Sequence, residues 1–139
     1  MKKMNNYVPS PEILKFINDK KRLPSYNVTR QLFIQFEDST KKRPQNIKRG
    51  KCAEIENALM HILLMISKAE LEKDAPEVRA RHLGAALDDL QEIKLNIQIL
   101  ADLHLLTPEG FSSLIFLEDD VAGQIYSWKR ETEKRIKTQ

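Results

Sequence analysis

Three histidines and a single cysteine are the side chains of this sequence best suited to bind a metal ion or to act as a nucleophile. Di-metal helical bundles use Glu-x-x-His pairs, but none of His61, His82 and His104 follows a glutamate by three residues. Zinc sites need several closely spaced thiolates and imidazoles, whereas Cys52 stands alone on an apolar stripe, where a small core residue is the commoner role. We therefore expect ordinary histidines, a buried cysteine, no metal and no cofactor.

Acidic side chains that could exchange protons form two clusters: Asp88, Asp89 and Glu92, and then Glu118, Asp119 and Asp120. Three interpretations are open: a metal or acid–base site, a solvated helix face, or a surface that meets a basic partner. The solvated face is the simplest, and the basic partner comes next. The sequence has no glycine-rich phosphate loop, no nucleophile elbow and no supported Ser/His/Asp set. We assign no catalytic residue and expect a protein that is not an enzyme.

The densest group of charged side chains is basic and contains no acid. Its members are Lys41, Lys42, Arg43, Lys48, Arg49 and Lys51. Clustered Lys and Arg side chains supply the salt-sensitive, sequence-independent part of nucleic-acid affinity, so we predict contact with RNA or DNA here. A second basic group could join the same face: Lys129, Arg130, Lys134 and Arg135.

Solubility or the pairing of subunits could equally account for these basic residues. Surface lysines and arginines are common, and Glu131 and Arg135 have the i,i+4 spacing of an ion pair within one helix. Aromatic side chains that could stack on bases are not interleaved with the cluster in residues 41–51. The sequence therefore predicts contact with the phosphate backbone rather than base-specific recognition of single strands.

Four segments with helical spacing of apolar residues must position these charged groups. They cover about 27–42, 46–72, 75–103 and 108–135. Apolar positions in the second segment alternate by three and four residues: Cys52, Ile55, Leu59, Ile62, Ile66 and Ala69. This is the pattern of helices packed at a shallow angle. Four long amphipathic helices with short connections predict an all-α, up-down-up-down four-helix bundle.

Helix-start signals indicate how the chain is divided. Ser10-Pro11-Glu12 and Thr107-Pro108-Glu109 each combine a capping hydroxyl, a proline and an early acid. Leu23-Pro24 interrupts the helix that the first signal would start. We therefore predict an N-terminal extension with a short helix over residues 1–24 and a four-helix bundle over residues 25–139.

The composition is that of a helix-rich protein, with 41% hydrophobic and 31% charged residues. No apolar run approaches the ~20 residues that cross a bilayer, the N-terminus lacks the apolar core of a signal peptide, and a lone cysteine fits a reducing compartment. We expect a cytoplasmic protein with no membrane contact. The charge is uneven: residues 1–73 carry +7, residues 74–128 carry −7 and residues 129–139 carry +3.

Apolar positions beside the four stripes exceed what a bundle core needs. They include Met60, Leu63, Leu64, Leu87, Leu95, Ile99, Ile115 and Phe116. The excess predicts either a wider core or a surface buried by self-association, of which we favour the second.

Several short features also follow one another in a characteristic order between Arg43 and Trp128. They are Pro44 with its basic turn, Gly50, the helix with Ile55-Glu56-Asn57-Ala58, the leucine-rich helix ending at Leu105-Leu106, the Thr107-Pro108 restart, and Gly123 through Trp128. In this order they resemble the accessory variability determinant (Avd) proteins of diversity-generating retroelements. The wider superfamily includes four-helix-bundle proteins encoded by intervening sequences in bacterial 23S rRNA genes. Residues 1–24 have no counterpart in the resemblance.

The resemblance implies a non-enzymatic subunit that assembles into a ring-like homopentamer and binds the element's reverse transcriptase. It also implies contact with RNA and DNA through basic surface residues during mutagenic retrohoming. In a ring, each subunit's patch meets a different patch on its neighbour. We expect Asp88, Asp89 and Glu92 to face the basic residues 27–51 of the next subunit. The alternatives are a small oligomeric interaction module with no nucleic-acid role and an enzyme, for which the apolar stripes offer no polar pocket.

Overall fold

The computed structural model of the chain describes residues 23–44 and 47–137, apart from the side chains of Lys48 and Arg49. Its helices are α2 (Pro24–Thr40), the π-helical turn η1 (Lys48–Cys52), α4 (Ala53–Leu71), α5 (Pro76–Asp102) and α6 (Pro108–Lys137). No strand occurs in these two ranges. The predicted all-α class is confirmed, and the helix predicted after Ser10 lies outside the described residues.

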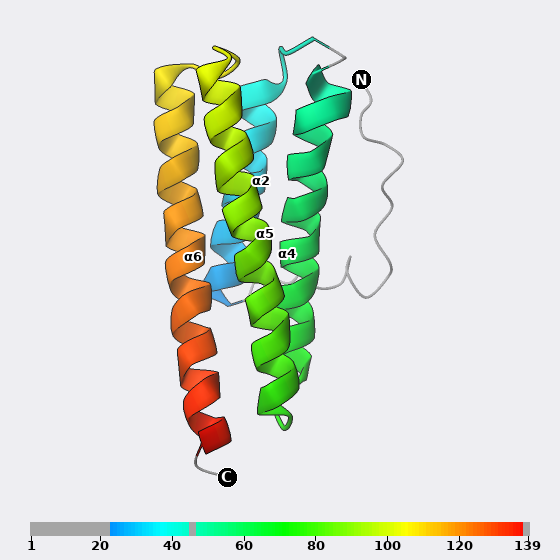
Figure 1. Cartoon of the computed structure of the whole chain (residues 1–139), viewed down its shortest axis with the longest axis vertical. Coiled ribbons are helices and arrows are strands. Elements are labelled where there is room, and N and C mark those ends of the chain that lie inside the picture. The colour runs from blue at the N-terminus through cyan, green and yellow to red at the C-terminus, as the bar shows by residue number, and fades with distance from the viewer. Residues whose placement is uncertain (1–22, 45–46, 138–139) are drawn as a thin grey trace.

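The four α-helices form an up-down-up-down bundle (Figure 1). Each helix contacts two others: α2 contacts α4 and α6, and α5 contacts α4 and α6. The first and last helices are therefore side by side, which closes the bundle. The α2–α4 and α5–α6 connections lie at one end of the molecule, and the α4–α5 turn lies at the other, with the C-terminal end of α6 (Figure 1).

Prolines start three of the helices, because a residue in the first turn needs no backbone N–H donor and proline is already at a helical φ. Pro24 begins α2, three residues before the predicted start, and Pro108 begins α6 as predicted. The hydroxyl Oγ1 of Thr107 accepts a hydrogen bond of 2.9 Å from the backbone N–H of Gly110. This is the predicted N-terminal cap of α6.

A π-helical turn is a feature that the apolar spacing did not predict. The sequence indicates one helix over about 46–72, but the structure forms the π turn of η1 before α4. A π turn adds a residue to the helical circuit and is frequent at functional sites. Here it carries three basic residues on its backbone and ends on Cys52, which is 1% exposed.

The core follows the predicted stripes. All six apolar positions named for the segment 46–72 are buried, as are Val28, Leu32 and Phe36 of α2. On α5 the buried positions are Leu83, Ala86, Leu90, Ile93, Ile97 and Leu100. Leu114, Val121 and Ile125 of α6 complete the core, and Trp128 packs against it half-buried.

The helix α2 is much shorter than α6, with 17 residues against 30. At 1.5 Å per residue the two helices are about 26 Å and about 45 Å long. Among the described residues, one part of the bundle therefore has four helices, and the part nearest the α4–α5 turn has three (Figure 1). No helix among the described residues is both long and apolar enough to cross a membrane.

Candidate nucleic-acid interface

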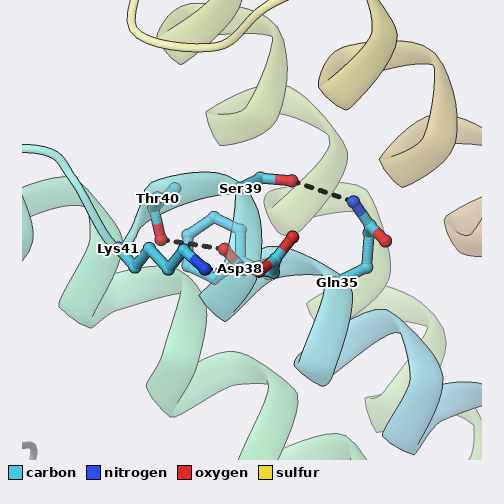
Figure 2. Close-up of polar contacts among 6 residues, drawn as sticks. Gln35, Asp38, Ser39, Thr40 and Lys41 are labelled. Carbon is cyan, nitrogen blue, oxygen red and sulfur yellow. Dashed lines mark hydrogen bonds and ion pairs between the residues drawn. The ribbon is translucent and has the colours of Figure 1, made fainter.

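The end of α2 presents the first three basic residues of the predicted cluster. Thr40 Oγ1 donates a hydrogen bond of 2.8 Å to the carbonyl oxygen of Phe36, and Gln35 Nε2 donates one of 3.1 Å to Ser39 Oγ (Figure 2). The backbone N–H of Arg43 bonds to the carbonyl oxygen of Thr40 at 3.0 Å. These bonds satisfy polar groups at the end of α2. The bond from Arg43 to Thr40 closes a sharp turn of the backbone where the lysines begin.

Lys41 and Lys42 are exposed at this turn. Lys41 Nζ lies 3.0 Å from an Asp38 carboxylate oxygen, and both side chains are more than 60% exposed (Figure 2). Exposed ion pairs of this kind contribute about 0–1 kcal/mol, so a phosphate can compete for the lysine. Arg43 is half-buried, and its Nε has no hydrogen-bond partner among the described residues.

The turn η1 brings the second half of the cluster to the same end of the bundle (Figure 1). Lys51 Nζ lies 3.4 Å from Glu54 in another exposed pair. The N-terminal end of a helix carries unpaired N–H groups and a partial positive charge. Lys48 and Arg49 have their backbones in this first turn. The positive end of the helix and the basic residues therefore reinforce one another.

The second basic group lies at the opposite end of the bundle, because α6 runs away from the α2–α4 connection (Figure 1). The expectation that it joins the first group on one face is wrong for this fold. Arg135 donates a hydrogen bond of 2.8 Å from its guanidinium to the carbonyl oxygen of Lys73 in the α4–α5 turn. This residue therefore ties α6 to a neighbouring turn.

The remaining residues of the second basic group, Lys129, Arg130 and Lys134, have partners on their own helix. Lys129 Nζ lies 2.6 Å from Glu133, and this hydrogen bond holds the pKa of the Glu133 carboxyl below its ordinary value. Lys134 lies 3.2 Å from Glu131. Arg130 lies over the ring of Tyr126, with 5.9 Å between its Cζ and the ring centre. Contacts at i,i+3 and i,i+4 support a helix, which accounts for this group without a nucleic-acid ligand.

The acidic side chains of the α5 cluster do not share one face of the helix. Asp88 and Glu92 are exposed, and their spacing of four places them on one outer face of the helix. Asp89 instead contacts His61 Nδ1 across the α4–α5 interface. Asp88 and Glu92 thus remain available to a neighbouring subunit, while Asp89 already has a contact within the bundle.

The acidic cluster of α6 is not wholly a solvated face. Asp119 lies 3.5 Å from Lys94 of α5, and Asp120 accepts a hydrogen bond of 3.0 Å from Gln124. Glu118, however, is only 3% exposed, and its Oε1 has no hydrogen-bond partner among the described residues. Burial raises the pKa of the Glu118 carboxyl to about 7, and Asp119 adds to the rise while Lys94 opposes it.

A simple sequence signal could have identified the burial of Glu118. It follows Leu114 by four residues and precedes Val121 by three, so it continues the buried stripe of α6. The apolar residues alone predict Leu117 on that stripe, and Leu117 is only half-buried. Acidic neighbours in sequence suggest a common face that helical geometry does not provide.

The histidines and the cysteine do not form a metal site. No group of three or more His, Cys, Asp and Glu side chains in the described parts of the chain is arranged to hold a metal ion. Burial lowers the pKa of His82, and nearby Lys68 lowers it further. His104 has a φ of 61° in the α5–α6 connection. Cys52 is buried, as predicted.

Comparison with known proteins gives no family assignment for this arrangement. No protein-family model matches the chain, and no curated protein matches it either. The function of the protein must therefore be inferred from the geometry above and from the resemblance in the order of its sequence features.

Proposed function

We propose that this protein is a non-enzymatic accessory subunit of a diversity-generating retroelement. In this role it assembles into a ring-like oligomer, with the pentamer as the expected size, and binds the reverse transcriptase of the element together with RNA and DNA. The observation that supports it most is the basic cluster on the α2–α4 connection. A sharp turn, a π turn and a helix N-terminus bring its residues to one end of a four-helix bundle.

The charge of this end favours a phosphate ligand. Lys41 and Lys51 each form an exposed ion pair, and Lys42, which follows Lys41 in the chain, is exposed. Neutralisation of phosphates by such side chains releases counterions, which makes the affinity fall steeply with salt. The second basic group lies at the far end of α6 and has partners on that helix or, for Arg135, in the α4–α5 turn, so we assign the binding of nucleic acid to residues 41–51 alone.

The outer faces of α5 and α6 support assembly. Leu95 is 57% exposed and follows Glu92 by three residues, so it extends the outer face that carries Asp88 and Glu92. Phe116 on α6 is 72% exposed. Large apolar side chains beside charges of one sign are typical of a surface that a partner covers. In the proposed ring this face packs against the next subunit.

Light scattering of the purified protein with and without a structured RNA, at low and high salt, tests the proposal. A five-subunit mass that binds RNA at low salt and releases it at high salt is the expected result. Asp88→Lys with Glu92→Lys should lower the mass, whereas Asp74→Lys with Glu131→Lys, exposed in the α4–α5 turn and on α6, should leave it unchanged. A monomer or dimer that is indifferent to RNA would contradict the retroelement role.

The second candidate is a small oligomeric interaction module with no nucleic-acid role. Exposed Leu95 and Phe116 favour it, because they provide a protein-binding surface without requiring phosphate contacts. An oligomer that binds no RNA even at low salt would support this candidate.

A further inference from the structure

A groove of about 840 Å³ lies where α2 begins, along the side of the bundle that α2 only half covers. Leu23 and Pro24 line it from the start of α2, Glu70 from α4, Arg79 from α5, and Asp120 and Trp128 from α6. Beyond Pro24 the position between α4 and α6 has no helix among the described residues (Figure 1). The groove is therefore the part of the bundle where the described residues provide three helices instead of four.

The groove combines apolar surface with acidic groups. Trp128 is half-buried, and Arg79 covers one face of its ring at 5.4 Å from Cζ to the ring centre. Leu23 and Pro24 add apolar surface next to it, while Asp119, Asp120 and Glu70 contribute three carboxylates against the two cations Lys73 and Arg79. An occupant that suits it has apolar side chains on one side and positive charges that reach Asp119 and Asp120.

We propose that residues 10–22 of the same chain bind in this groove and complete the fourth side of the bundle. They directly precede Leu23, which itself lines the groove, so the segment is attached to the rim of the site. The segment carries closely spaced apolar residues, Ile13, Leu14, Phe16 and Ile17. They recur at the intervals that place side chains on one side of a helix.

Length and charge both fit this occupant. A helix over the whole segment would span about 20 Å, and α6 continues for about 15 Å beyond Ser127. Lys20, Lys21 and Arg22 form a basic run directly before Leu23 and come within reach of Asp119 and Asp120. The same attachment raises the effective concentration of the segment at the groove far above that of a separate molecule.

Amide hydrogen exchange of the full chain tests the proposal. After correction for intrinsic rates, residues 10–22 should exchange at least about tenfold more slowly than residues 1–9, because their bound state must open first. Gly123→Arg places a long cationic side chain in the groove, where an added Cβ meets no atom within 4 Å. This variant should bring the exchange of residues 10–22 close to that of residues 1–9.

Ser113→Arg is the matched control, since it adds the same side chain to an exposed position of α6 away from the groove. It should leave the protection unchanged, and circular dichroism should show both variants folded. Rapid exchange of residues 10–22 in the unmodified chain would overturn the proposal, as would protection that survives Gly123→Arg. Protection that disappears on dilution would identify the segment of a second copy as the occupant and would equally overturn it.

The fluorescence of Trp128, the single tryptophan of the chain, provides an independent test of the proposal. Phe16→Asp should shift its emission to longer wavelength and make it more accessible to acrylamide. Asn18→Asp adds the same charge two residues away on a polar position and should have little effect. Identical emission from the two variants would show that the segment does not cover Trp128. None of these outcomes depends on RNA binding.

Discussion

Arg79 Nε donates a hydrogen bond of 2.7 Å to the carbonyl oxygen of Ala69, which joins the start of α5 to the last turn of α4. A second guanidinium nitrogen lies 3.4 Å from the carbonyl oxygen of Glu70, and the group lies over the ring of Trp128 of α6. The last carbonyl groups of a helix have no partner within it. One arginine thus satisfies the end of α4 and brings three helices together.

Arg79→Ala should lower the free energy of unfolding by about 2 kcal/mol, because it removes charge-assisted hydrogen bonds to helix-terminal carbonyls and a cation–π contact. Arg79→Lys should lose most of the same amount, since an ammonium lacks the planar fork. Urea titration measures both. Arg81→Ala, exposed two residues away, is the control and should change stability by less than about 0.5 kcal/mol. Equal effects at the two positions would contradict this role of Arg79.

Arg135 should act on stability and not on nucleic-acid affinity. Arg135→Ala removes the hydrogen bond to the Lys73 carbonyl, which should cost about 1 kcal/mol. Lys134→Ala, its exposed neighbour, should leave the thermal midpoint nearly unchanged. Thermal unfolding and a filter-binding assay on both variants check the prediction. Loss of RNA binding in Arg135→Ala without loss of stability would show that Arg135 belongs to the nucleic-acid-binding surface.

Glu118 should make the protein less stable as the pH rises. Its carboxyl has a pKa of about 7 in the folded protein against an ordinary value of 4.5. The folded state therefore holds a proton that the unfolded state has released, and the stability falls between these two pH values. Above pH 7 the loss should reach about 2–3 kcal/mol. Urea titrations from pH 4 to pH 8 measure it.

Glu118→Gln should remove this pH dependence and stabilise the protein at pH 8, because the amide needs no deprotonation. Asp120→Asn on the exposed surface is the control and should preserve the decline. A Glu118→Gln variant that still loses stability over the same pH range would show that another group is responsible.

The basic cluster should control nucleic-acid binding separately from folding. Lys48→Glu, Arg49→Glu and Lys51→Glu together should abolish retention of RNA while helicity and the thermal midpoint stay nearly intact, since the pair of Lys51 with Glu54 is exposed and exposed pairs contribute little to stability. Arg130→Glu with Lys134→Glu at the other end of the bundle is the control and should retain binding. Loss of fold in the triple variant would indicate a structural role instead.

The helices could be predicted closely because their signals are local. Apolar spacing identified the buried positions between Cys52 and Ala69, and Thr107-Pro108 identified the start of α6. The contact between Arg79 and Trp128 could not be foreseen, since it depends on how α5 and α6 cross. The π turn was also missed, because one extra residue in a helix leaves no distinct apolar pattern.

Charge clusters were less informative than apolar stripes. The two basic groups carry similar residues, yet helix direction puts them at opposite ends and gives Arg135 a backbone carbonyl as partner. Burial in the core fixes where an apolar side chain lies, but it does not fix where a charged side chain lies. Charged residues that are close in sequence are therefore not always close in the structure. Three-dimensional placement is needed to separate Lys42, which is exposed, from Glu118, which is buried.

The contact between α2 and α6 has a consequence for the order in which the protein is made. The pairs α4–α5 and α5–α6 join neighbours in the chain, so each can form once its second helix has left the ribosome, and local contacts form fast. The helix α2, whose Leu32 and Phe36 are fully buried in the folded protein, also contacts α6, so its packing is complete only when α6 arrives. We expect newly synthesised chains to depend on chaperones or partners at α2 until translation is complete.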